Sequence, residues 1–231
     1  MKLTKKVGNW ALNKYVIAPI LMWLYSQKWY YDLIMKWMPR LRLSTTFPVP
    51  ENTNFIHWGA LAQKGFKKLQ PGDIILTHDK DKILTKIIGK ATANENEDFI
   101  PAHAALCVSN NPDDPFQIAE MTQHNFTKST WTDLCYESTR VMIIRCKDFS
   151  KDYIQKALIP KCKSFRNVKY DIKFNQGAEE LICSELVYFS DVNHKLDVDL
   201  TPLIGHKPYI SPMGLLKAKN IEIIWDSNKE Y

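Results

Sequence analysis

The sequence predicts an α+β fold in which a small antiparallel sheet packs against a helix that carries Cys183. Short apolar runs bounded by turn residues predict strands over 73–77, 103–109, 116–121, 141–145 and 221–225. Segments with helical spacing predict helices over 58–68, 82–92, 151–166 and 183–192, the third of them bent or split at Pro160. A run of strands followed by helices is typical of the α+β class.

The composition is that of an ordinary globular protein. Of the 231 residues, 45% are apolar and 24% charged, which supplies enough apolar material for a core and excludes disorder over the whole chain. With only 8 Gly and 12 Pro, a collagen-like chain is excluded as well. No uninterrupted run of 18 apolar residues occurs, which argues against a standard membrane-spanning helix.

Positive charge is concentrated at the start of the chain. Residues 1–70 hold 11 Lys and Arg against 2 acidic residues, a net charge of +9, while the rest of the chain has a net charge of −3. Residues 1–38 hold four of the seven tryptophans: Trp10, Trp23, Trp29 and Trp37. We expect helices broken near Pro19 and then a proline-containing linker. We therefore divide the chain into a helical, basic and aromatic extension with its linker (1–50) and a second, globular domain (51–231).

Three interpretations of this extension stay open. An uncharged run over 15–25 behind a basic start resembles a signal peptide, although aromatic residues replace the small residues that a cleavage site needs. Residues 1–38 could instead bind an anionic membrane surface, or pack on their own domain or on a second copy in a homodimer. We expect a cytoplasmic or peripheral membrane protein rather than an exported one. No nucleic-acid partner is expected, because the bases outside the extension are balanced by acids.

The five cysteines are scattered and odd in number: Cys107, Cys135, Cys146, Cys162 and Cys183. The absence of a CxxC pair argues against a zinc ribbon or a dithiol redox site. We expect free thiols in a reducing compartment. No metal site and no organic cofactor are expected, since the sequence has neither a zinc-ligand spacing nor a dinucleotide fingerprint.

Three residues have the local context of a thiol-based active site. Cys183 opens a predicted helix, where free backbone N–H groups and the positive helix end stabilise a thiolate. His103 begins an apolar strand, and Glu120 is an acid inside another, where it needs a polar partner. A facing imidazole would activate the thiol, and an acid would orient the ring. Each also has a structural interpretation: a small buried thiol, a satisfied histidine and a strand-edge acid.

Five sequence blocks occur in a recognisable order: PGDII at 71–75, HAALCV at 103–108, IAE at 118–120, YD at 170–171 and ICSELV at 182–187. Together they resemble the YiiX/YebB-like branch of the NlpC-type papain-like cysteine hydrolases, over about residues 69–225. That branch is circularly permuted, so the resemblance implies a permuted papain-like fold whose catalytic histidine precedes its cysteine. The CSELV block preceded by Tyr-Asp is the most specific part, whereas residues 1–68 match nothing in the family.

The resemblance implies a role for four residues. Cys183 matches the nucleophile, His103 the general base and Glu120 the acid that orients the imidazole. Tyr170 matches a tyrosine that supports the oxyanion, with the Cys183 backbone N–H as the other donor. The sequence departs from many relatives at Ala104, which follows the histidine and affects packing but leaves the imidazole in place.

The implied activity is hydrolysis of an amide or peptide bond in a substrate like a cell-wall peptide, through an acyl-enzyme on Cys183. The permuted branch also resembles the lecithin:retinol acyltransferase-like enzymes, which implies a second hypothesis: a lipid acyl hydrolase or acyltransferase acting at a membrane. The basic and aromatic extension favours this alternative. A non-catalytic module that binds such ligands is a third hypothesis.

Overall fold

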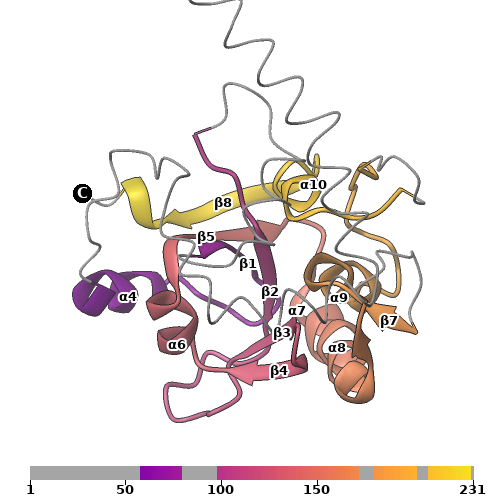
Figure 1. Cartoon of the computed structure of the whole chain (residues 1–231), viewed down its shortest axis with the longest axis horizontal. Coiled ribbons are helices and arrows are strands. Elements are labelled where there is room, and N and C mark those ends of the chain that lie inside the picture. The colour runs from indigo at the N-terminus through magenta and orange to yellow at the C-terminus, as the bar shows by residue number, and fades with distance from the viewer. Residues whose placement is uncertain (1–57, 80–97, 172–178, 202–207, 230–231) are drawn as a thin grey trace, which may run out of the picture.

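The computed structural model describes residues 58–79, 98–171, 179–201 and 208–229 (Figure 1). The helices expected over 1–38, the linker and the helix over 82–92 lie outside these residues. The proposed division of the chain at residue 50 lies outside them too and stays a prediction. Among the described residues, no helix has the length and apolar character needed to cross a membrane.

Six antiparallel strands form the main sheet, in the order β4-β3-β2-β1-β5-β8. Their bounds are β1 (Ile74–Asp79), β2 (His103–Cys107), β3 (Ile118–Thr122), β4 (Asn125–Ser129), β5 (Ser138–Cys146) and β8 (Ile221–Asp226). All five predicted strands are present, with ends that differ by a few residues. The antiparallel sheet combined with helices confirms the α+β class.

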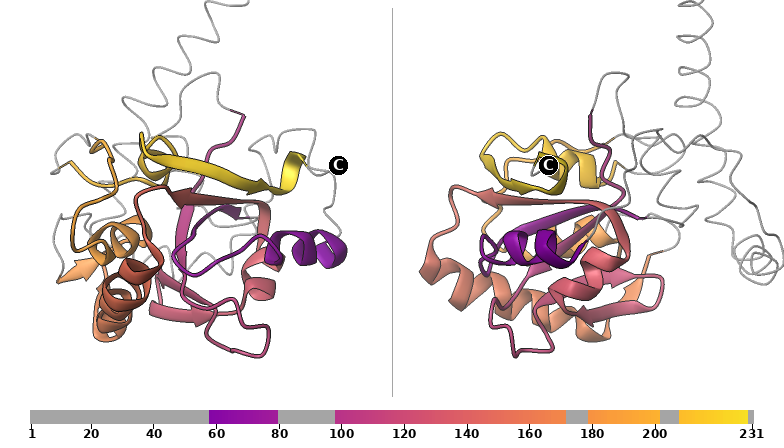
Figure 2. Two further views of the ribbon diagram at one scale, coloured as in Figure 1. Left: turned by 180° about the vertical axis from the view of Figure 1, so that it is seen from behind. Right: turned by 90° about the vertical axis from the view of Figure 1, so that its left-hand side faces the viewer.

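The sheet buries both of its faces, and the two faces carry different helices. Along β1, the side chains of Ile74 and Leu76 enter one apolar cluster, whereas Ile75 between them enters the other, as the two-residue period of a strand requires. Helices α4 (Trp58–Phe66) and α6 (Trp131–Tyr136) cover the second cluster. On the other side lie α7 (Lys151–Tyr153), α8 (Ile159–Ser164) and α9 (Cys183–Ser190), as Figures 1 and 2 show.

The helix expected over 151–166 is present, but its hydrogen-bonding pattern changes just before Pro160. Between α7 and α8 the chain forms the π-helical turn η2 (Ile154–Leu158), and a 3-10 turn, η3 (Phe165–Asn167), follows α8. Pro160 has no backbone N–H, and its ring would clash with the carbonyl four residues earlier in a regular α-helix. The wider π turn accommodates this proline within a continuous helical segment.

Several short elements were not predicted. They are β4, α6, the parallel two-stranded pair β6 (Lys169–Tyr170) and β7 (Glu180–Leu181), α10 (Pro212–Leu216) and the final 3-10 turn η4 (Ser227–Lys229). Strand β4 has the sequence NFTKS, which lacks the apolar alternation of a half-buried strand. It forms because a tight hairpin pairs Thr122 with Asn125, and Asn125 adopts the left-handed conformation (φ 71°) that asparagine tolerates.

A buried ion pair ties the start of β1 to β5. Gly72 has a φ of +91°, which glycine adopts without strain, and the chain then enters β1 through Asp73. The Asp73 carboxylate is 1% exposed and accepts hydrogen bonds from Nε and Nη2 of Arg145, at 2.6 and 2.8 Å, and from the backbone N–H of Gln70 at 2.7 Å. Burial raises the pKa of Asp73, and the bonds from Arg145 offset part of this effect.

The Arg145→Ala variant is expected to lower the free energy of unfolding by about 3 kcal/mol, because it leaves a buried carboxylate without its cation. Urea unfolding at neutral pH measures the loss. Lys156→Ala is the matched control: its ion pair with Asp152 is equally short, at 2.6 Å, but both side chains are more than 70% exposed. That change should cost about 0.5 kcal/mol or less. Equal losses in the two variants would contradict the role given to Arg145.

Candidate active site

The strand register brings His103, Glu120 and Ser129 onto one face of the sheet. Ala105 on β2 lies opposite Glu120 on β3, so His103, two residues before Ala105, is a diagonal neighbour of Glu120. Ile118 lies opposite Ser129 on β4, which makes Ser129 a diagonal neighbour of Glu120 in turn. The three polar side chains therefore form a row across neighbouring strands.

Hydrogen bonds connect this row. The Nε2 atom of His103 lies 2.8 Å from Oε2 of Glu120, and the Ser129 hydroxyl donates to the other carboxylate oxygen, Oε1, at 2.5 Å. The Glu120 residue is 8% exposed, and the side chain of His103 is 12% exposed. Because each carboxylate oxygen has its own partner, the Glu120 carboxylate is fixed in orientation and fixes the imidazole ring.

Hydrogen bonds from the residues directly before and after Cys183 hold it at the first turn of α9. The preceding residue, Ile182, donates its backbone N–H to Oε2 of Glu185 at 3.1 Å. The following residue, Ser184, donates its hydroxyl to the carbonyl of Ile210 at 2.7 Å. Further along the helix, Leu186 and Val187 are fully buried in the apolar cluster that lies against the sheet. The helix start thus has little freedom to move relative to the core.

The structure brings Cys183 and His103 together. Burial alone would lower the pKa of His103, but hydrogen bonds with the Cys183 thiol and the Glu120 carboxylate raise it well above its ordinary value. Since Nε2 is directed to Glu120, Nδ1 is the ring nitrogen that can exchange a proton with the sulfur. Cys183, His103 and Glu120 therefore form one contiguous array, and Ser129 extends it.

Tyr170 lies on β6, which pairs with β7 directly before the Cys183 turn. Its backbone N–H donates to Oδ1 of Asn125 in the β3–β4 hairpin at 3.1 Å, and its half-buried side chain packs against the apolar cluster on the α9 side. This position connects the hairpin that carries Glu120 with the segment that leads to Cys183. The role of Tyr170 in supporting an oxyanion stays a prediction.

The remaining four cysteines lack such surroundings. All five cysteines are free and buried. Burial raises the pKa of the other four thiols above the ordinary value, in the case of Cys162 to about 12; the others are Cys107, Cys135 and Cys146. Thiols of this kind are weak nucleophiles at neutral pH, since the thiolate is the reactive form.

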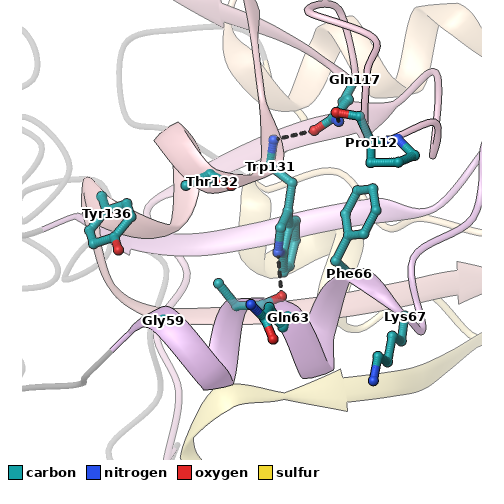
Figure 3. Close-up of a pocket in the computed structure, with 10 residues that line it drawn as sticks. Gly59, Gln63, Phe66, Lys67, Pro112, Gln117, Trp131, Thr132 and Tyr136 are labelled. Atoms are coloured by element: carbon teal, nitrogen blue, oxygen red, sulfur yellow. Dashed lines mark hydrogen bonds between the residues drawn. The ribbon is translucent and has the colours of Figure 1, made fainter.

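A separate pocket lies between α4 and α6 and contains none of these residues. It has a volume of about 410 Å³ and is lined mainly by residues of α4 and α6, among them Phe66, Trp131 and Tyr136 (Figure 3). The Trp131 side chain closes one wall, where its Nε1–H donates to the carbonyl of Ala62 at 2.8 Å and its backbone N–H donates to Gln117. This pocket does not contribute to the array around Cys183.

Removing the charge of Glu120 is expected to lower the pKa of His103. Glu120→Gln keeps the size of the side chain but replaces an anionic partner of the imidazolium by a neutral amide. The imidazolium, which the wild-type site retains to an elevated pH, will then lose its proton at a lower pH, so the alkaline limit of Cys183 reactivity moves down. An NMR titration of the His103 ring measures the shift. Glu180→Gln changes an exposed residue of β7 and should leave this titration unchanged. An unchanged or higher pKa of His103 in Glu120→Gln would contradict the assignment.

Comparisons with known proteins identify the family and the fold of the chain. Residues 68–219 match the model of a family described as "Permuted papain-like amidase enzyme, YaeF/YiiX, C92 family". The crystal structure of yiiX from Escherichia coli O157:H7 is similar in fold, with a TM-score of 0.54 at 14% identity, over 68% of this chain and 97% of that one. No match was found among curated proteins.

The E. coli protein is described as a metalloprotein. In the part of the present chain that the structure describes, no group of three or more His, Cys, Asp or Glu side chains is arranged to hold a metal ion. The residues gathered around Cys183 are those of a thiol–imidazole–carboxylate site.

Proposed function

Because the chain belongs to the YaeF/YiiX (C92) family of permuted papain-like amidases, and is thus a cysteine hydrolase, we propose that it cleaves an amide bond in a peptide of the cell-wall type through an acyl-enzyme on Cys183. One observation carries this proposal. A buried thiol at a helix start shares a histidine with a carboxylate that is fixed by a second hydrogen bond. This arrangement supplies a nucleophile, a proton carrier and an orienting group.

In the proposed reaction, the Cys183 sulfur attacks the carbonyl carbon while His103 holds the thiol proton. The electron pair of the C=O double bond moves to oxygen, and the backbone N–H of Cys183 and the hydroxyl of Tyr170 are the proposed donors to this oxyanion. When the intermediate collapses, the C–N bond breaks and His103 gives its proton to the leaving amine. A thioester on Cys183 remains.

In the second half of the proposed reaction, water hydrolyses the thioester on Cys183. His103, now neutral, removes a proton from water, and the resulting hydroxide adds to the thioester carbonyl. Collapse of this second intermediate breaks the C–S bond, releases the carboxylic acid and returns the proton to the Cys183–His103 pair. Glu120 orients His103 and stabilises the imidazolium in both halves.

The substrate class is tested by incubating the full chain with three substrates side by side: purified bacterial cell-wall peptides, a fluorogenic peptide amide and a medium-chain phospholipid. The proposal predicts release of new amino and carboxyl groups from the peptides, with the phospholipid left intact. Cleavage of the phospholipid alone would favour the lipid alternative. If no substrate turns over and the peptides still bind, the non-catalytic alternative holds.

The lipid alternative is supported by the extension at the start of the chain, which has 8 Lys and Arg against one acidic residue over residues 1–50, and four tryptophans. Each basic residue near an anionic membrane contributes about 1 kcal/mol of attraction. We therefore expect the full chain to co-sediment with anionic vesicles, with binding weakened by salt and absent on neutral lipid. A protein that begins at residue 47 should remain in the supernatant; equal sedimentation of both proteins would remove the membrane role from this segment.

A further inference from the structure

The pocket between α4 and α6 has no part in the proposed reaction, yet it has the features of a small-molecule site. Its volume of about 410 Å³ lies within the range of roughly 300–1,000 Å³ that is common for such sites. Three aromatic side chains line it: Phe66 from α4, and Trp131 and Tyr136 from α6 (Figure 3). Tyr136 is 55% exposed, so part of this apolar lining is open to solvent.

Trp131 forms a rigid wall of the pocket. Its indole N–H donates to the carbonyl of Ala62 and its backbone N–H donates to the side-chain oxygen of Gln117, both at 2.8 Å. The ring of Trp225 packs edge-on against the indole, with 5.9 Å between the ring centroids. Gly65 permits this packing, because a Cβ at that position would lie 2.6 Å from the indole of Trp131. The wall is therefore preorganised, which lowers the cost of binding a ligand.

Gly59 leaves the pocket accessible from the start of α4. It lines the pocket as the second residue of the helix, and a Cβ added there would meet no atom within 4 Å. A glycine within a helix is destabilising relative to alanine. Gly59 has neither a close packing contact nor a positive φ that would require glycine. The missing side chain instead keeps space open beside the aromatic lining.

The lining also carries one positive charge. Among the described residues that form it, Lys67 is charged and none is acidic. Gln63 and Thr132 are exposed and add an amide and a hydroxyl. Asp133, in the first turn of α6, is engaged elsewhere, because the Thr130 hydroxyl donates to its carboxylate at 2.7 Å. Aromatic walls beside a single ammonium group complement a ligand that has an aromatic ring and a carboxylate.

We propose that this pocket binds a small aromatic carboxylate, with the ring between the aromatic side chains of α4 and α6 and the carboxylate toward the Lys67 ammonium group. The site is independent of the proposed function, since the pocket shares no residue with the array around Cys183. Because Lys67 is exposed, water and salt screen its attraction for the carboxylate. The charge therefore sets the preference among ligands of similar shape, while the aromatic contacts supply most of the affinity.

An NMR titration of the full chain with three probes tests the proposal. The probes share a naphthalene ring and differ in charge: 2-naphthylacetate, 2-(2-naphthyl)ethanol and 2-(2-naphthyl)ethylamine. We expect 2-naphthylacetate to cause saturable shifts of the Gly59 amide and the Trp131 indole N–H. It should bind about 5-fold more tightly than the alcohol, as one exposed charge pair allows, and the amine should bind most weakly.

Two pairs of variants locate the ligand. Lys67→Gln should weaken binding of 2-naphthylacetate by about 5-fold and leave the alcohol unaffected. Its matched control is Lys68→Gln, a neighbouring exposed lysine that does not line the pocket, which should leave the affinity for the carboxylate unchanged. Gly59→Phe fills the open space and should abolish binding of all three probes. Ala60→Phe adds the same ring at an adjacent exposed position outside the pocket and should preserve binding.

Several results would overturn the site. Equal affinities for the acetate and the alcohol, or an unchanged affinity for the acetate in Lys67→Gln, would remove the role of the carboxylate. Binding that persists in folded Gly59→Phe would place the ligand elsewhere. If the same resonances shift with protein concentration alone, a second copy of the chain covers the pocket. If no probe binds, the pocket is not a ligand site.

Discussion

Replacing Cys183 with alanine will lower the turnover of an amide substrate by about 10⁴-fold or more, since it removes the atom that forms the acyl-enzyme. The fold should persist, because an alanine side chain fits the space of the thiol and favours the helix that begins there. Initial rates with saturating peptide amide measure the effect, and circular dichroism checks that the variant is folded.

Cys135→Ala is the matched control for this loss. Cys135 is also a buried free thiol on a helix, but it lies in α6, against the opposite face of the sheet. We expect wild-type turnover from this variant. If Cys183→Ala retains a substantial fraction of wild-type turnover, or if Cys135→Ala abolishes it, the nucleophile has been assigned to the wrong residue.

His103→Ala should reduce turnover by about 10³-fold, because the thiol loses the base that accepts its proton and the leaving amine loses its acid. Glu120 then lies near the site without its imidazole partner, although its bond from Ser129 remains. The loss should appear in kcat far more than in KM, since His103 acts on the reacting atoms rather than on the bound substrate.

Added imidazole offers a direct check on His103→Ala. If His103 acts only as a proton carrier, imidazole in solution should restore part of the lost rate, and more of it as the concentration rises. Imidazole should have no such effect on Cys183→Ala, which lacks the nucleophile. Full activity of His103→Ala without added imidazole would contradict the proposed role of the histidine.

The central array could be predicted from the sequence because each member is unusual for its surroundings. His103 and Glu120 are polar residues in apolar strands, and Cys183 begins a helix whose later residues are apolar. The strands themselves were recognisable from the same apolar runs. The blocks around these residues also occur in the order of a known family, and the match over residues 68–219 confirms that resemblance.

Ser129 and the contact between Ser184 and Ile210 could not be predicted in the same way. Ser129 lies in a strand of polar sequence, and its contact with Glu120 depends on the exact register of the β3–β4 hairpin. The segment that contains Tyr209 and Ile210 lies beside the start of α9, where the Ser184 hydroxyl donates to the carbonyl of Ile210. Such contacts depend on pairings between distant segments, which leave no periodic pattern in either segment. A tyrosine followed by Ile210 and Ser211 reads simply as an apolar loop entering a short helix.

Mass spectrometry of the enzyme quenched with acid during turnover of a slowly hydrolysed peptide ester tests the account most directly. The account predicts an increase in mass equal to the acyl group of the substrate, located by peptide mapping at Cys183 and absent from Cys183→Ala. In His103→Ala, the adduct should form more slowly, at the same residue. An acyl group found on another residue, or turnover of the ester with no adduct on Cys183 under conditions that trap thioesters, would contradict the proposed mechanism.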